Sequence, residues 1–283
     1  MQSRAQAFVF HGGEAVQLHA PDGSSAVLRR QGAQVVSWVS GAGVEQLYLS
    51  PLARWGASTA IRGGIPVIFP QFGERGPGPR HGLARTADWT LHTVHPQDDA
   101  AQAVLTLASS PATQALWPQE FQCELSVVLG SGSLSVSLRV TNTGDAPWVF
   151  TAALHNYFRV CARDSAVLTG LHGLFFEDTL QTSGNLSLDP HPELRVNEPI
   201  DRIYHEVPGE LQLRSTHRVL RLAAHGFRDA VVWNPGEQAA ASMADLPKDH
   251  YQQFLCVESA AIAQPVRLSG GESWCGSQQL QSL

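Results

Sequence analysis

Two neighbouring segments, residues 121–129 and 134–141, constrain the fold of this chain most strongly. In the second segment, leucine and valine alternate with serine, arginine and threonine, which puts the apolar side chains on one face of an extended strand. The tetrapeptide GSGS at 130–133 lies between the segments and is typical of a hairpin turn. The sequence therefore predicts an antiparallel pair of half-buried strands, because a helix would need apolar residues three or four positions apart.

Short runs of the same kind recur along the chain, and no long stretch holds a 3.6-residue period. Residues 149–160 are predicted as one strand, 239–244 as a helical turn, and 189–199, rich in proline and acids, as an exposed loop. We find no internal repeat or linker, and 283 residues is an ordinary length for one large all-β unit. The pattern predicts a single domain over residues 1–283, built as a large antiparallel β-sandwich or barrel.

Composition narrows the classes of partner and compartment. A formal net charge of −6 argues against a nucleic-acid or anionic-membrane partner. The four cysteines lie far apart without CxxC spacing, which argues against a zinc site and a disulfide framework. The N-terminus has no apolar signal region, and no run of about 18 apolar residues occurs. We expect a soluble, cytoplasmic protein with no membrane partner.

Residues 61–85, here called the arginine-rich segment, interrupt the strand pattern. Glycine and proline break them repeatedly and exclude an ordinary helix, whereas their isoleucine, valine and phenylalanine side chains favour burial. Between Arg54 and Arg85 there are five arginines and one acid, Glu74. Arginine suits planar recognition of phosphate or carboxylate. The local charge therefore indicates an anion site, buried ion pairs, or both.

The common nucleotide and hydrolase motifs are absent. There is no GxGxxG, P-loop or HExxH, and the nearest approach to a GxSxG elbow, GESWC at 271–275, lacks the final glycine. The chain has 12 histidines, but no pair of them has recognisable ligand spacing. We expect no metal and no cofactor.

Several polar residues stand in apolar strand contexts, and each has a structural interpretation beside a functional one. Glu258 in FLCVESAAI must be paired, hydrogen-bonded or raised in pKa, and His155 lies in ALHNYF. Either could be a satisfied structural residue. Asp201 could cap a turn or pair with Arg202, and His81 could be a core histidine that donates to a backbone carbonyl.

Two further structural interpretations concern arginine and tryptophan. Arg62 could form an ion pair with Asp201 or Glu74 instead of binding a ligand. Trp89 and Trp233 are interpreted as core residues in preference to platforms for a sugar ring.

The order of several motifs resembles the aldose 1-epimerase superfamily, and most closely its glucose-6-phosphate 1-epimerase (hexose-6-phosphate mutarotase) branch. The resemblance runs from about residue 8 to about residue 280 and implies a galactose mutarotase-like supersandwich. The motifs are IRGGIPVIFPQFG, HGLAR, ALHNYF, DRIY, VVWNP, MAD, YQQFLCVE and LSGGESW.

This resemblance also implies roles for individual residues. His155 corresponds to the catalytic acid and Glu258 to the catalytic base. The substrate-binding or pocket positions that it implies are Arg62, Arg80, His81, Arg85 and Asp201.

The implied activity is the interconversion of the α and β anomers of a hexose 6-phosphate. One acid and one base suffice for this reaction, because no hydride moves and no charge is stored. The implied partner is a small sugar phosphate, and a monomer is expected. A mutarotase for free aldoses and a non-catalytic carbohydrate-binding relative are the alternatives.

Overall fold

The computed structural model describes residues 3–96, 99–181, 184–216 and 218–283. The chain is 52% strand and 7% helix, and all pairings between its named strands are antiparallel. The all-β antiparallel architecture predicted from the alternating segments is therefore confirmed.

The strands of the described residues form three sheets. The four-stranded sheet consists of β1 (Arg4–Phe10), β2 (Gly13–His19), β3 (Ser25–Arg29) and β4 (Gln34–Val39). The eight-stranded sheet consists, in spatial order, of β14 (Leu186–Leu188), β13 (Phe175–Asp178), β16 (Ile200–Tyr204), β19 (Asp229–Asn234), β20 (Phe254–Leu268), β10 (Trp148–Leu154) and β5 (Val67–Ile68), with β11 (Tyr157–Arg159) beside β20. The nine-stranded sheet consists of β15 (Glu193–Arg195), β12 (Ala166–Thr169), β17 (Glu210–Ser215), β18 (Arg218–His225), β21 (Ser273–Ser282), β9 (Ser133–Asn142), β8 (Phe121–Gly130), β7 (Ala100–Ala108) and β6 (Thr90–Pro96).

Helices are few and short. The α-helices are α1 (Pro111–Gln114) and α2 (Gly236–Ala241), and the 3-10 turns are η1 (Ala84–Thr86), η2 (Arg163–Ser165) and η3 (His250–Gln253). The helical turn predicted at 239–244 corresponds to α2, which begins three residues earlier. No helix in the described part of the chain has the length and apolar character needed to span a bilayer.

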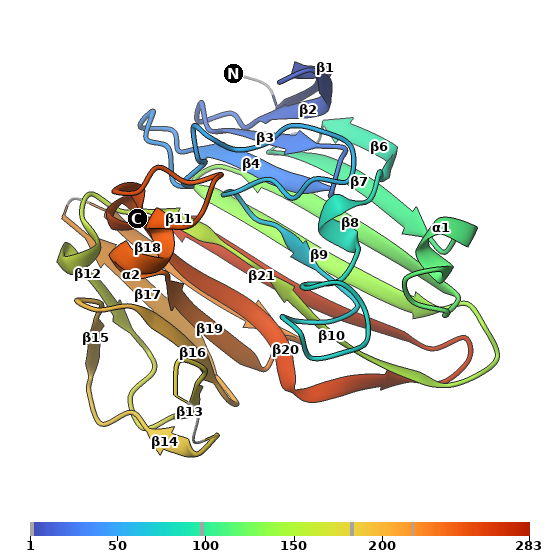
Figure 1. Cartoon of the computed structure of the whole chain (residues 1–283). Helices are drawn as coiled ribbons and strands as arrows, with labels where there is room; N and C mark the ends of the chain where they lie inside the picture. Colours follow the sequence, from blue (N-terminus) through green and yellow to red (C-terminus); the bar gives the residue numbers. More distant parts are fainter. Residues whose placement is uncertain (1–2, 97–98, 182–183, 217) are drawn as a thin grey trace.

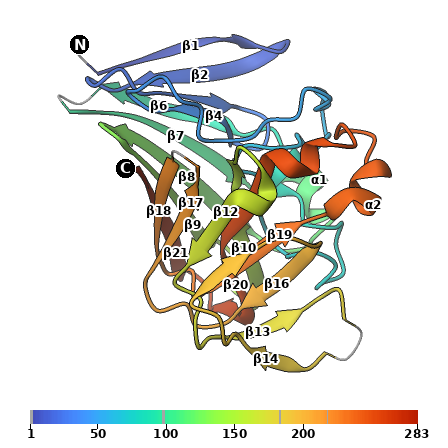
Figure 2. The same cartoon turned by 90° about the vertical axis from the view of Figure 1, so that its left-hand side faces the viewer.

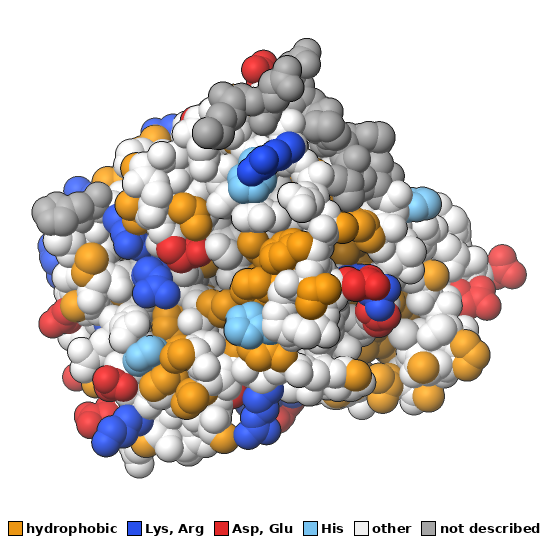
Figure 3. Space-filling model, turned by 90° about the horizontal axis from the view of Figure 1, so that it is seen from above, with side chains coloured by type: hydrophobic (Ala, Val, Ile, Leu, Met, Phe, Trp, Pro, Cys, Tyr) orange, Lys and Arg blue, Asp and Glu red, His pale blue; other side chains and the backbone are white. Residues whose placement is uncertain are grey.

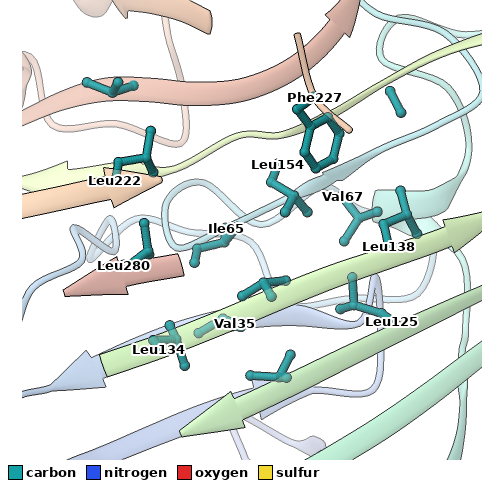
Figure 4. Close-up of a cluster of buried hydrophobic side chains, with 14 of the residues drawn as sticks. Val35, Ile65, Val67, Leu125, Leu134, Leu138, Leu154, Leu222, Phe227 and Leu280 are labelled. Carbon is teal, nitrogen blue, oxygen red and sulfur yellow. The ribbon is translucent and has the colours of Figure 1, made fainter. Parts of the chain in front are cut away.

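The three sheets share one apolar core. The four-stranded sheet lies at the top of the molecule beside β6 and β7, above the two larger sheets (Figures 1 and 2). Figure 4 shows Val35 of β4, Leu138 of β9 and Leu154 of β10 in one cluster, so each sheet contributes side chains to it. All three side chains are buried.

The predicted hairpin is formed by β8 and β9. Leu129 faces Leu134 and Gly130 faces Ser133, so the turn falls where the glycines were found. In β9 the side chains of Leu134, Val136, Leu138 and Val140 are all buried. The serine and arginine residues between them are more accessible. The period-two interpretation of this pair is confirmed.

Two local expectations were wrong. The strand predicted over 149–160 is interrupted between β10 and β11 at Asn156, because its backbone amide donates to the carbonyl of Leu154 (3.1 Å) instead of joining the ladder with β20. The loop expected at 189–199 contains β15, and its first residue, Asp189, is buried where it accepts a hydrogen bond from the hydroxyl of Tyr204 (2.7 Å).

The arginine-rich segment is irregular, as predicted, and is held against the core. It contains only the two residues of β5 and the turn η1 as regular elements. Its chain leaves the core at Phe69 and returns there, because the amides of Leu83 and Ala84 both donate to the Phe69 carbonyl (2.9 and 3.1 Å). This closed excursion brings Leu83 and Ala84 beside Phe69, the residue that follows β5, and β5 pairs with β10.

The face seen from above has a mixed surface (Figure 3). Hydrophobic side chains gather across its middle, and charged side chains lie around them. Folded proteins ordinarily expose much apolar surface, so we assign no function to this face.

Candidate active site

A cavity of about 470 Å³ lies between the eight-stranded sheet and the arginine-rich segment. It brings together every residue that the sequence singled out as a site candidate: Arg62, Arg80, His81, Arg85, His155, Asp201 and Glu258.

His155 and Glu258 lie side by side in the cavity. Their positions follow from strand pairing: Leu154 faces Ser259, Tyr157 faces Cys256, and β11 keeps the register that β10 has against β20. Nε2 of His155 lies 3.3 Å from Oε1 of Glu258, and the two side chains are 9% and 1% exposed. This separation is close to hydrogen-bond reach, so a proton can pass between them.

Burial favours the uncharged form of both groups. Desolvation, followed by the nearby His81, Arg85 and Arg62, holds the pKa of His155 well below its usual value. Desolvation, followed by Asp201, holds the pKa of Glu258 well above its usual value. A neutral imidazole beside a carboxylic acid carries one movable proton, the same number as an imidazolium beside a carboxylate.

The His155 ring is fixed by aromatic neighbours. It stacks on Tyr157 with ring centres 4.7 Å apart and planes within 6°. The edges of Trp233 and His81 approach it at 5.9 and 5.8 Å. Trp233 lines the cavity and also packs against buried apolar clusters, whereas Trp89 is 1% exposed and belongs to the core as expected.

His81 presents a neutral ring to the cavity. Its backbone has φ of 64°, and its Nδ1 accepts a hydrogen bond from the amide of Gly73 (3.2 Å). Burial, followed by the charges of Arg85, Arg80 and Arg62, lowers its pKa to about 3. Because Nδ1 accepts, the ring proton resides on Nε2. The His81 ring therefore accepts a hydrogen bond from a backbone amide. One interpretation of the sequence had it donate to a backbone carbonyl instead.

Arg62 is held by an acid that the sequence did not suggest. Its Nε lies 3.2 Å from both carboxylate oxygens of Asp245, and its Nη1 donates to the hydroxyl of Tyr157 at 3.1 Å. The ion pair foreseen for Arg62 exists, but neither Asp201 nor Glu74 is its partner. Arg62 therefore enters the cavity with its orientation fixed and part of its charge compensated.

Arg85 and Arg80 differ from Arg62 because neither forms an ion pair with an acid of the described residues. Nη2 of Arg85 donates to the Arg80 carbonyl (2.8 Å), and its Nε is buried without a partner in the described chain. Burial lowers the pKa of Arg85, and the neighbouring Arg62 and Arg80 lower it further against an opposing effect of Tyr157. Arg80 is exposed at the mouth. The cavity thus holds two cations without acid partners.

Asp201 completes the wall on β16, where it faces Trp233 of β19. Burial raises the pKa of its carboxyl. In the described chain Arg202 pairs with Asp178 (3.8 Å) and Asp189 (4.0 Å) and not with Asp201, so the ion pair considered for Asp201 and Arg202 does not form.

Sequence reasoning missed Tyr157, Trp233 and Asp245. Tyr157 could have been found, because the period of two places it on the same strand face as His155. Asp245 lies in the MAD motif of the resemblance, but its contact with Arg62 could not be foreseen, because it reaches Arg62 from a distant loop. No cluster of three or more metal-ligating side chains occurs in the ranges that the structure describes.

Comparison with known proteins places these observations in context. A family model described as "Aldose 1-epimerase" matches residues 14–281. A "Putative glucose-6-phosphate 1-epimerase" from Cenchrus ciliaris is 33% identical over 280 residues, covering 95% of this chain and 85% of the relative. A protein of the same name from Escherichia coli (strain K12) is 29% identical over 244 residues, covering 84% and 80%.

Solved structures agree with the fold expected from the resemblance. The crystal structure of a "putative mutarotase" from Salmonella typhimurium has a TM-score of 0.90 at 25% identity, over 98% of this chain and 93% of that one. A galactose mutarotase-like protein from Lactobacillus casei has a TM-score of 0.77 at 18% identity, over 95% and 100%. The galactose mutarotase-like sandwich is therefore confirmed.

Proposed function

The chain belongs to the aldose 1-epimerase family, and from this premise we propose that it interconverts the α and β anomers of a hexose 6-phosphate. The observation that carries the proposal is a buried acid–base pair, His155 and Glu258 at 3.3 Å, in a cavity that also holds two arginines without acid partners.

The pair supplies the two proton transfers of mutarotation. Glu258, as a carboxylate, accepts the proton of the C1 hydroxyl while protonated His155 donates a proton to the ring oxygen O5. The C1–O5 bond breaks with its electron pair leaving on O5, and C1 becomes an aldehyde carbonyl. After rotation about C1–C2, O5 attacks the other carbonyl face. His155 then takes its proton back and Glu258 returns one to O1.

The starting protonation of the pair fits this cycle. Burial favours the carboxylic acid of Glu258 and the neutral ring of His155. Transfer of one proton from Oε1 to Nε2 gives the ion pair that the reaction uses. Oε2 of Glu258 and Nδ1 of His155 lack hydrogen-bond partners within the described chain. Sugar hydroxyls that donate to Oε2 would stabilise the carboxylate and so favour that transfer.

Arg85 and Arg80 are the groups we assign to the 6-phosphate. Arg85 is half-buried with no partner for its Nε in the described chain, and arginine binds phosphate with two parallel hydrogen bonds. Held at its phosphate end, the sugar would present C1 and O5 to the acid–base pair. Arg62 is already paired with Asp245, so we assign it a supporting role.

The pairing of Arg62 also favours one alternative, a mutarotase for free aldoses. In that case the Asp245 carboxylate and the Tyr157 hydroxyl beside Arg62 would bind sugar hydroxyls, and Arg85 would be structural. The same acid–base pair would serve both substrates, so only the role of the arginines separates the two proposals.

Anomeric exchange measured by NMR on α-glucose 6-phosphate and α-glucose, in parallel, tests the proposal. We expect the wild-type protein to accelerate exchange of the phosphate. Glu258→Gln and His155→Ala should each lower the rate about 10²- to 10⁴-fold, the range typical of one lost proton transfer. The exposed Glu237→Gln and His172→Ala are matched controls and should behave as wild type. Full activity in either active-site variant would contradict the acid–base assignment.

The same assay tests the arginines. Arg85→Gln should raise KM for glucose 6-phosphate strongly and leave free glucose little changed. The exposed Arg54→Gln, a control from the same arginine-rich part of the chain, should alter neither. Equal losses on both sugars would return Arg85 to a structural role and favour the free-aldose alternative.

A further inference from the structure

A buried polar cluster lies directly behind the acid–base pair. Asn156, Gln278 and Ser259 are 0%, 2% and 1% exposed, and their side chains enter the apolar core between the two large sheets. None of them lines the cavity of about 470 Å³. The cluster therefore takes no part in the chemistry described above.

The hydrogen bonds of the cluster form a closed set. Nδ2 of Asn156 donates to Oε1 of Gln278 (2.9 Å), and Nε2 of Gln278 donates back to Oδ1 of Asn156 (2.7 Å). Nδ2 of Asn156 also donates to the carbonyl of Val257 (2.8 Å), and the hydroxyl of Ser259 donates to Oε1 of Gln278 (2.9 Å). A carbonyl can only accept, so Val257 fixes the orientation of the Asn156 amide and, through it, that of Gln278.

The position of the cluster in the strands links it to the acid and the base. Asn156 follows His155, and Val257 and Ser259 flank Glu258. In extended chain neighbouring side chains point to opposite faces, so His155 and Glu258 face the cavity while Asn156 and Ser259 face the core. Gln278 lies on β21, in the middle of the nine-stranded sheet. One side chain of that sheet thus hydrogen-bonds to the side chains that neighbour both groups in sequence.

We propose that Asn156, Gln278 and Ser259 are positioning residues that set the distance and orientation of His155 relative to Glu258. The need for them follows from the break in the β20 ladder at this point: the Asn156 backbone amide donates to the carbonyl of Leu154, and it is the Asn156 side chain that donates to the carbonyl of Val257. The ladder with β20 therefore lacks one backbone hydrogen bond directly beside His155 and Glu258. The cluster supplies the missing constraint from the core side.

The proposal rests on the proposed acid–base function and adds to it. A displacement of about 1 Å in a catalytic group can cost on the order of 100-fold in rate, although binding of the substrate is unaffected. Loss of the cluster should accordingly lower kcat and spare KM. A cluster that served stability alone would lower the melting temperature and leave kcat per folded molecule unchanged.

Four variants test the proposal. Gln278→Met keeps the length of the side chain and removes its hydrogen bonds. Gln279→Met is the matched control, because Gln279 is the next residue on β21 and is exposed. Asn156→Leu/Gln278→Met removes both members of the amide pair and leaves neither unsatisfied. Ser259→Ala removes one hydrogen bond and is the mildest change.

Anomeric exchange rates and melting temperatures are measured for all four. For Gln278→Met we expect kcat to fall about 10- to 100-fold with KM within about twofold of wild type. The double variant should keep the low kcat, and Gln279→Met should match wild type. Wild-type kcat in folded Gln278→Met would overturn the proposal. If Gln278→Met does not fold, Ser259→Ala decides: a lowered kcat supports the proposal and an unchanged kcat overturns it.

A readout independent of turnover separates this proposal from the proposed function. The NMR resonances of the His155 ring, assigned with His155→Ala, report its surroundings even if the wild-type protein acts on no sugar tested. We expect these resonances to shift in Gln278→Met and to stay in place in Gln279→Met. Unshifted resonances in Gln278→Met would overturn the positioning role, whereas absent turnover in the wild type would overturn only the proposed function.

Discussion

The Glu258 carboxyl is almost fully buried, and ionising it in the folded protein requires more free energy than ionising it in the unfolded chain. The nearby Asp201 acts in the same direction. A buried carboxyl of this kind can serve as an acid or base only because the rest of the fold is stable enough to offset the free energy lost by burying it. The residue that we assign as the base is therefore also one that lowers the stability of the protein.

This cost predicts a pH-dependent gain in stability for Glu258→Gln. Above the usual glutamate pKa of about 4.5 the unfolded chain releases this proton, whereas the folded protein, with its raised pKa, retains it. The wild-type contribution to stability therefore falls as pH rises. We expect the melting temperature of Glu258→Gln, relative to wild type, to increase between about pH 4.5 and pH 8. A constant or shrinking difference, measured by calorimetry across this range, would contradict the raised pKa.

The sequence identified the candidate site residues better than it identified the contacts that these residues make. His155 and Glu258 could be selected because polar groups in apolar strands need a reason to be there. The pairing of Arg62 with Asp245 could not be foreseen, because it depends on how a loop near α2 folds over the cavity. The resemblance to a known family supplied the roles, and the local sequence alone left each of them open.

At the scale of elements, the arginine-rich segment is the part that builds the cavity. Its excursion from Phe69 back to Phe69 carries Arg80 and His81, and its closing turn carries Arg85. The closure depends on Gly82, which has φ of 70° and lies so close to Phe69 that a Cβ would overlap the Phe69 carbonyl. Glycine is required there for both reasons.

A pair of glycine variants tests this closure. Gly73→Ala introduces a Cβ at φ of 56° into open space, so it should lower the free energy of unfolding by about 1–2 kcal/mol. Gly82→Ala adds a steric overlap, and we expect a loss of roughly 2–5 kcal/mol together with a raised KM for glucose 6-phosphate. Denaturant unfolding and the exchange assay measure both effects. Equal losses in the two variants would show that the closure does not depend on close approach.

Elements were predictable where their signal is local. The hairpin of β8 and β9 follows from alternation within each strand and from the turn between them. The interruption at Asn156 was missed because it depends on a side-chain hydrogen bond to Val257, a residue distant in sequence. The prediction of an exposed loop at 189–199 was wrong for a similar reason. The hydroxyl of Tyr204 donates a hydrogen bond to the carboxylate of Asp189, which is buried.

At the scale of the whole molecule, one apolar core joins the three sheets. Side chains of β4, β9 and β10 meet in this core (Figure 4). Unfolding of one sheet would therefore expose buried side chains of the other two. This arrangement supports the prediction of a single domain over residues 1–283, because separate domains would each have a core of their own.

The shared core predicts one cooperative unfolding transition. Calorimetry should give a single peak whose calorimetric and van't Hoff enthalpies agree. In native-state hydrogen exchange, amides of β3 should require the same free energy of opening as those of β9. An earlier transition confined to β1–β4 would contradict the single-domain prediction and identify the four-stranded sheet as a separate unit.

The alternation of His155 and Asn156 has a consequence for how such a chain can diverge. His155 faces the cavity and Asn156 faces the core. Two consecutive residues of the same extended stretch therefore serve function and folding respectively. Inserting or deleting one residue in β10 would exchange the two faces and place an amide in the cavity and an imidazole in the core. Sequence change is therefore confined here to substitution, while the loops around the cavity remain free to vary in length and to alter substrate preference.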